Sequence, residues 1–115
     1  MSIYSQYVDF YHNELLKNEK NSNARDYLKN RSLGKGEVKK FKIGYIEKNP
    51  TFFDKLKNEF SEQTLVESGL FYLDEKKKIY VERFRGRLIF PINNISGQPI
   101  ALGGRIIENL DYLAK

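Results

Sequence analysis

The hydrophobic pattern of the sequence changes at Gly69, and this change most constrains the fold. Before Gly69, large apolar side chains recur at the spacing of amphipathic helices. After it, short apolar runs alternate with turn-forming residues, which is typical of strands. Residues 1–69 are therefore predicted to be mainly helical, and residues 70–115 to form a small, mainly antiparallel β-sheet. This order indicates an α+β fold rather than alternating βαβ units.

Apolar spacing and end signals predict the individual helices. Thr51, with Asp54 three residues later, resembles a capping box. Ser61 is a second N-cap residue, and Gly69 suits the left-handed position that ends a helix. The predicted helices cover residues 2–18, 24–33 and 37–41, and two more begin at Thr51 and Ser61.

Strands are predicted from β-branched and aromatic residues bounded by turns. Residues 42–46 are expected to be extended. Residues 70–73 and 79–81 form a predicted hairpin with a charged tip. Residues 87–92 and 99–107 form a second pair, joined by a turn rich in Asn and Gly.

Length and charge narrow the possible functions. A chain of 115 residues fills one small core, so residues 1–115 are predicted to form a single domain. Twenty Lys and Arg residues against fifteen Asp and Glu residues give a net charge of +5. This excess suits a polyanionic partner such as a nucleic acid, and it equally suits a basic solvated surface.

The residue types that are missing exclude several kinds of site. The chain has no cysteine, and His12 is its only histidine. Disulfides, thiol nucleophiles and zinc or iron sites are therefore not expected. No apolar run approaches the length of a membrane span, and the N-terminus does not resemble a secretory leader. The expected compartment is the cytoplasm, without a membrane partner.

The segment between Arg83 and Arg105 carries four arginines and no carboxylate. If it is a strand, alternation places Arg83, Arg85 and Arg87 on one face and apolar residues on the other. The arginine spacing, about 6.6 Å, matches successive phosphates of an extended nucleic-acid strand. The alternative is ion pairing with Glu82, Glu75 or helix carboxylates. Glu82 alone could not neutralise three arginines.

The sequence contains no convincing reaction centre. Gly103-Gly104 in a predicted strand marks a bulge or a close approach of another segment, but it is neither a phosphate-binding loop nor a dinucleotide-binding motif. The pair Asp74-Glu75 lies in a predicted turn, where solvated charge is the simpler interpretation. The chain offers a surface for an anion rather than a catalytic constellation.

Three ordered motifs resemble a known family. Residues 82–92, Glu-Arg-Phe-Arg-Gly-Arg-Leu-Ile-Phe-Pro-Ile, are followed by Gly97 and Gly103-Gly104-Arg105. This string is similar to the motif of bacterial DnaG-type DNA primases. Upstream, residues 24–33 resemble the family's Ala-Arg-x-Tyr-Leu-x-x-Arg-Gly-Leu, with Ser32 in place of the glycine, and residues 41–45 resemble its Phe-x-(apolar)-Gly-(aromatic) element.

The resemblance implies the N-terminal subdomain of the RNA polymerase core of a replicative DNA primase, which copies single-stranded DNA into RNA primers. It implies as partners the DNA template, the RNA–DNA hybrid, nucleoside triphosphates, the Toprim subdomain and, through a C-terminal region, the replicative helicase. Magnesium or manganese is expected on the Toprim subdomain and zinc on a separate N-terminal domain. We therefore expect this chain alone to make no primers.

The resemblance also implies binding residues. Arg83, Arg85 and Arg105 match basic family positions at the cleft for template and nucleotide, and Arg25 matches a position on the template track. Lys115 would open the family's Lys-Tyr-(apolar)-Asn-Ser motif, in which case the chain ends where that motif continues. No catalytic or metal-binding residue is expected within the chain.

Two other functions remain open on the sequence alone. A free-standing nucleic-acid-binding module would need only the basic segment and would bind tightly by itself. A protein-interaction domain would direct its arginines to an acidic partner. An independent small enzyme has the least support.

Overall fold

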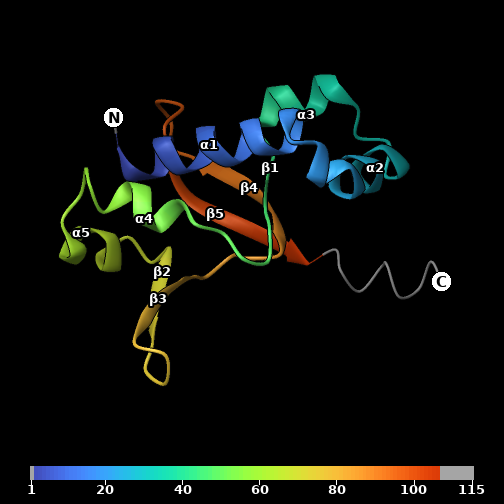
Figure 1. Cartoon of the computed structure of the whole chain (residues 1–115). Helices are drawn as coiled ribbons and strands as arrows, with labels where there is room; N and C mark the ends of the chain where they lie inside the picture. Colours follow the sequence, from blue (N-terminus) through green and yellow to red (C-terminus); the bar gives the residue numbers. More distant parts are fainter. Residues whose placement is uncertain (1, 107–115) are drawn as a thin grey trace.

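A single long helix forms one side of the computed structural model, which describes residues 2–106. Helix α1, Ile3–Lys17, begins at Ser2, whose hydroxyl accepts the N–H of Ser5. It lies along the three-stranded sheet, with the shorter helices at its two ends (Figure 1). Its buried residues share one face, as the helical spacing predicts; they are Tyr7, Val8, Tyr11, His12 and Leu15.

The remaining helices are short and lie in two groups. They are a 3-10 helix at Glu19–Asn21, then α2 at Ser22–Asn30, α3 at Lys35–Phe41, α4 at Phe52–Leu56 and α5 at Glu62–Glu67. Helices α2 and α3 lie near the C-terminal end of α1, and α4 and α5 lie near its N-terminal part (Figure 1). No helix among residues 2–106 is long and apolar enough to cross a membrane.

The strands form two antiparallel sheets. Strands β1 (Gly44–Ile46), β4 (Arg87–Asn93) and β5 (Pro99–Ile106) form a three-stranded sheet in the order β1-β4-β5. Strands β2 (Phe71–Asp74) and β3 (Ile79–Glu82) form a separate hairpin. Figure 1 shows this hairpin projecting away from α1. The predicted α+β class and both predicted hairpins are confirmed.

Strand β4 is covered on both faces, which divides the core into two clusters. Leu88 packs with Leu15, Leu28 and Val38 on the side of α2 and α3. Its neighbour Ile89 points the opposite way. Both side chains are fully buried. The sequence predicts that one face of the arginine-bearing strand is core and that the other carries the ligand-binding arginines. Within β4 this prediction is wrong, because consecutive apolar residues are buried on both faces of the strand.

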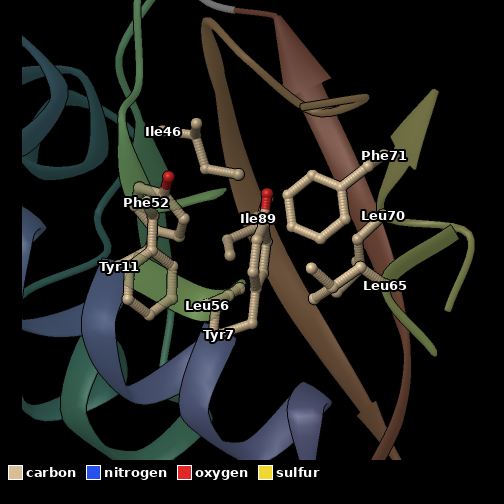
Figure 2. Packing of buried hydrophobic residues seen from close by; sticks show 9 residues of the cluster. All are labelled: Tyr7, Tyr11, Ile46, Phe52, Leu56, Leu65, Leu70, Phe71 and Ile89. Atoms are coloured by element: carbon tan, nitrogen blue, oxygen red, sulfur yellow. The ribbon is translucent and has the colours of Figure 1, made fainter. Parts of the chain in front are cut away.

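The larger cluster lies between α1, α4, α5 and the two sheets. Figure 2 shows its members, which are Tyr7, Tyr11, Ile46, Phe52, Leu56, Leu65, Leu70, Phe71 and Ile89. Aromatic rings dominate it, and Tyr7 and Tyr11 meet edge to face with centroids 4.9 Å apart. Full burial of each large apolar side chain contributes about 1.5–3 kcal/mol. This cluster therefore attaches the β2–β3 hairpin to α1.

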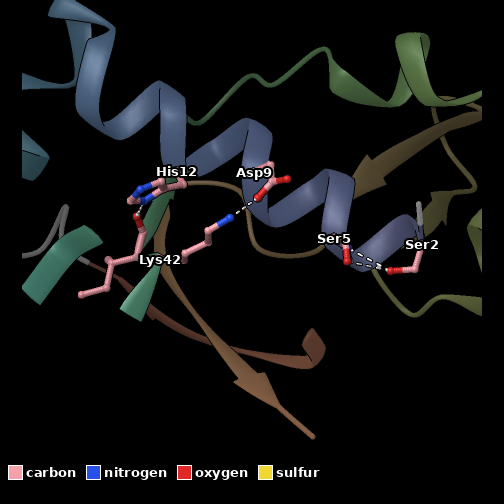
Figure 3. Close-up of polar contacts among 6 residues, drawn as sticks. Ser2, Ser5, Asp9, His12 and Lys42 are labelled. Carbon is pink, nitrogen blue, oxygen red and sulfur yellow. Dashed lines mark hydrogen bonds and ion pairs between the residues drawn. The ribbon is translucent and has the colours of Figure 1, made fainter. Parts of the chain in front are cut away.

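Helix α1 and strand β1 are in close contact. A Cβ atom on Gly44 would lie 2.9 Å from the carbonyl carbon of Tyr11, so only glycine fits without displacing the helix backbone. His12 Nδ1 donates to the carbonyl of Ile43 at 2.8 Å, and Lys42 pairs with Asp9 at 2.7 Å (Figure 3). The sole histidine is thus a buried structural donor.

The structure tests the predicted helix ends individually. Ser61 caps α5 by accepting the N–H of Thr64, and Gly69 has φ of 78°, so both predictions are confirmed. Thr51 precedes α4, but its side chain makes no capping hydrogen bond, so the capping-box prediction is wrong. The N–H groups of Phe52 and Phe53 instead interact with the carboxyl of Glu82.

Glu82 is a buried acid at the end of β3. Its side chain is 2% exposed, and its Oε1 accepts the hydroxyls of Tyr7 at 2.7 Å and Tyr11 at 2.5 Å. Its Oε2 is buried and has no hydrogen bond of good geometry within residues 2–106. Burial raises the pKa of this carboxyl, and the hydrogen bonds from Tyr11 and Tyr7 partly counter the shift. The contact joins α1 to the end of the hairpin.

Glu82 should make stability depend on pH. Because its pKa is raised above the ordinary value of 4.5, the folded chain keeps this proton where the unfolded chain has lost it. Its contribution to the free energy of unfolding should therefore decrease as pH rises from 4.5 through the raised pKa. Glu82→Gln should abolish this dependence. Glu82→Ala should cost about 1–3 kcal/mol for each tyrosine hydroxyl left without an acceptor.

Urea unfolding at about pH 5 and about pH 8 measures both effects. Glu75→Gln is the control, because Glu75 is an exposed glutamate in the turn of the hairpin. An equal pH dependence in Glu82→Gln and in the unaltered chain would contradict this account.

Candidate nucleic-acid interface

The arginines of the central motif lie in a turn. Strand β3 ends at Glu82 and β4 begins at Arg87, so residues 83–86 are not a strand, and the predicted strand geometry is wrong here. Gly86 makes the reversal possible with φ of 72°. Its N–H bonds to the carbonyls of Ile46 at 2.7 Å and Glu47 at 3.1 Å. We call residues 83–87 the arginine turn.

The arginine turn still separates charged from apolar side chains as the sequence predicts. Arg83 and Arg85 are exposed, whereas Phe84 is partly buried against the larger core cluster. Leu88 is fully buried, and Phe90 is partly buried against the other cluster. The apolar residues anchor the turn and leave the charges at the surface.

Each arginine of the turn is held by neutral acceptors. Arg83 Nε donates to the carbonyl of Gly69 at 2.9 Å, and Arg85 Nη1 donates to the hydroxyl of Tyr72 at 2.9 Å. Arg87 Nη1 donates to the carbonyl of Arg83 at 3.0 Å. Carbonyl and hydroxyl oxygens fix a guanidinium in place without neutralising it. The full positive charge therefore remains available to an anion.

Tyr72 organises two of these side chains. The guanidinium carbons of Arg83 and Arg85 lie 5.5 and 5.8 Å from the centroid of its ring. These cation–π contacts add to the hydrogen bond that Arg85 makes with the hydroxyl. Tyr72 could not be identified as a site residue from the sequence, because it is only one tyrosine on a hairpin strand and its contact with the turn depends on the fold.

The expected alternative, ion pairing of these arginines, does not occur within residues 2–106. The ion pairs described there are Lys42 with Asp9 and Lys57 with Asp54. The carboxyl of Glu82 is directed into the core and bound by tyrosines. The nearest acid in the sequence therefore does not pair with the arginines that follow it.

The structure places the other predicted binding residues elsewhere. Arg25 lies in α2, where its Nη1 donates to the carbonyls of Leu15 and Asn18, both at 2.8 Å, at the end of α1. Cationic donors stabilise the last carbonyls of a helix, so Arg25 has a structural role in this position. It lines a mainly apolar hollow of about 290 Å³ rather than the arginine turn.

Arg105 is exposed on β5, directly opposite Leu88. Side chains at paired positions share a sheet face, so Arg105 and Arg87 begin on opposite faces of the sheet. Arg83 and Arg85 come together at Tyr72. Arg105 lies on β5, the strand that pairs with β4. Lys115 lies outside the described residues.

The described residues provide no metal centre. No group of three or more His, Asp or Glu side chains within residues 2–106 is arranged to hold an ion. The chemical capacity of this surface is anion binding by fixed guanidinium groups.

The backbone at Gly104 packs so closely against the arginine turn that a side chain has no room there. A Cβ atom there would lie 2.6 Å from Cδ1 of Phe84 and 3.2 Å from Cδ of Arg87. Gly104→Ala should therefore displace the turn and lower the free energy of unfolding by about 1–3 kcal/mol, as overpacking does. Urea unfolding measures this change.

Gly103→Ala is a matched control, because the nearest atom to its Cβ would be the Phe90 carbonyl oxygen at 3.9 Å, an ordinary contact. Equal destabilisation by both substitutions would contradict the proposed contact with Phe84.

Comparison with known proteins places these features in a family. The family model described as DNA primase catalytic core, N-terminal domain, matches residues 10–114. A DNA primase of Lactococcus lactis is 35% identical over 115 residues, which cover 98% of this chain and 18% of that protein. The chain thus spans about a fifth of the length of this relative.

Solved structures agree with the sequence comparison. A DnaG primase catalytic domain bound to single-stranded DNA has a TM-score of 0.79 and 28% identity, over 92% of this chain and 33% of that chain. The zinc-binding and RNA polymerase domains of Aquifex aeolicus primase give a TM-score of 0.75 and 29% identity, over 90% of this chain and 25% of that chain. The chain belongs to the family of DNA primase catalytic core N-terminal domains.

Proposed function

We propose that this chain is the template-binding subdomain of a DNA primase that synthesises RNA primers on single-stranded DNA. One observation carries the proposal: Arg83, Arg85 and Arg87 are fixed by neutral acceptors and have no carboxylate partner among the described residues. Three fixed positive charges in five residues match a polyanion. The likeness to a primase domain bound to single-stranded DNA supports the choice of ligand.

The arginine turn would act by holding the sugar-phosphate backbone of the template. Phosphate contacts set the position of a strand and carry no sequence information, so the base sequence would be copied through Watson–Crick pairing. The anchored guanidiniums lose little conformational freedom on binding, since their side chains are already ordered. The turn would therefore place the template at a fixed distance from the rest of the enzyme.

Arg105, Arg25 and Lys115 extend this proposal. Arg105 would contact template or nucleotide phosphates from β5, on the sheet face opposite to Arg87. Arg25 would contribute to the template track through those guanidinium nitrogens that do not cap α1. Lys115 is proposed from the family motif alone.

The cofactors and further partners of the enzyme are proposed from the family resemblance. This resemblance is the basis for assigning magnesium or manganese to a Toprim subdomain and zinc to a separate N-terminal domain. Nucleoside triphosphates, the RNA–DNA hybrid and the replicative helicase are the further partners, and the cytoplasm is the compartment. The chain alone is expected to make no primers.

Single arginine substitutions should weaken DNA binding through charge. Arg83→Ala and Arg85→Ala should each lower the slope of log affinity against log salt by about 0.7, the value for one lost contact to a single strand. The effect should be the same for different base sequences. Fluorescence anisotropy with a labelled oligothymidylate, starting near 0.01 M salt, measures it. Arg105→Ala in the same series tests its place on the track.

Lys57→Ala is the control, because it removes one positive charge from a residue that is paired with Asp54 at 3.4 Å. If the two arginine variants keep the slope of this control while remaining folded, the arginine turn does not bind the template.

A further inference from the structure

The arginine turn borders a hollow that contains a lysine from a distant part of the sequence. This hollow of about 300 Å³ is open to solvent and is lined by Lys48, Arg85, Gly86, Arg87 and Ile106. Its lining residues place it at one end of the three-stranded sheet. Figure 1 shows this end of the sheet, where the chain leaves β1, enters β4 and leaves β5. Three of its five lining residues are cationic and none is acidic.

Backbone hydrogen bonds bring Lys48 to this position. The N–H of Gly86 bonds to the carbonyls of Ile46 and Glu47, so the residues after β1 are fixed beside the arginine turn. The pairing of Arg87 with both Ile46 and Ile106 then fixes the other sides of the hollow. The hollow therefore follows from the sheet register and does not depend on a chance contact between flexible side chains.

The acid next to Lys48 does not share the hollow. Glu47 lines a different hollow with Tyr11, Tyr45 and Thr51. Its charge contributes to the raised pKa of Tyr11 of α1, behind burial and the contact with Glu82. Lys48 makes no ion pair with a described carboxylate.

Each arginine here uses one nitrogen for anchoring. Arg85 Nη1 bonds to the Tyr72 hydroxyl and, at 3.4 Å, to the Glu82 carbonyl, and Arg87 Nη1 bonds to the carbonyls of Arg83 and Arg85. Their Nε and Nη2 atoms make no hydrogen bond to the described residues. The three cationic residues that line this hollow carry like charges, and an anion bound between them would offset their repulsion. A phosphate group matches the guanidinium donors in geometry and the lysine in charge.

We propose that this hollow is a phosphate-binding site in which Lys48 acts with Arg85 and Arg87. The inference rests on the proposed function for the source of the phosphate, either the backbone of a single strand or the triphosphate of a nucleotide. Both present the same chemistry to the hollow. A phosphate bound there would be held from the loop after β1 as well as from the arginine turn, so that it would link these two segments.

The test compares Lys48→Ala, Lys48→Arg and Lys57→Ala in the 115-residue chain, with circular dichroism to verify folding. Two probes are used. Binding of a labelled oligothymidylate is measured by fluorescence anisotropy against salt, and binding of inorganic tripolyphosphate is measured by NMR shifts of the backbone amides of residue 48 and Gly86. Lys48→Ala should lower the salt slope for the oligonucleotide by about 0.7, and Lys48→Arg should restore it. Lys57→Ala should retain the slope of the unaltered chain, since that lysine is paired away from the hollow.

The two probes separate the phosphate sources. If Lys48→Ala weakens binding of the oligonucleotide alone, the phosphate belongs to a nucleic-acid backbone. If it weakens binding of tripolyphosphate alone, the phosphate belongs to a nucleotide triphosphate. If Lys48→Ala matches Lys57→Ala with both probes while Arg85→Ala still weakens DNA binding, the Lys48 site is wrong and the proposed function stands. If no variant differs from the unaltered chain, or that chain binds neither probe, both are wrong.

Discussion

The buried carboxyl of Glu82 is the contact on which the proposed binding surface depends. It accepts hydrogen bonds from Tyr7 and Tyr11 of α1 and faces the first N–H groups of α4, so one side chain joins three elements. The arginine turn starts at the next residue. A buried acid without these donors would cost several kcal/mol, so its partners must be in place when the hairpin docks. The position of the turn is therefore coupled to the core.

The same contact determines the charge of the surface. With Glu82 directed inward, the arginines that follow are ordered by carbonyls and by Tyr72. An exposed ion pair would contribute little to stability, about 0–1 kcal/mol, and would cancel the field that attracts a polyanion. Neutral anchoring gives order without that cancellation. A family motif of alternating arginine and apolar residues thus corresponds to a turn whose apolar members pack and whose charges remain free.

The sequence predicts the element types well, because periodicity and end signals are local. The helix over residues 2–18, the Ser61 cap and both hairpins required no knowledge of tertiary contacts. Failures occurred where a distant residue decides the outcome. Glu82 replaces Thr51 at the start of α4, and burial of Ile89 follows from packing on both faces of the sheet.

The proposed binding residues divide in the same way. Arg83 and Arg85 could be chosen from the missing carboxylates in their segment, and they do lie together at the surface. Tyr72 and Lys48 could not be chosen, because only the sheet register brings them to the turn. NMR of the arginine side-chain Nε–Hε groups during titration with an oligothymidylate tests the central claim most directly. The account predicts salt-reversible shifts at Arg83 and Arg85 that are larger than those of Arg31, an exposed arginine over the ring of Tyr27. Equal shifts at all three, or none at the arginine turn, would contradict it.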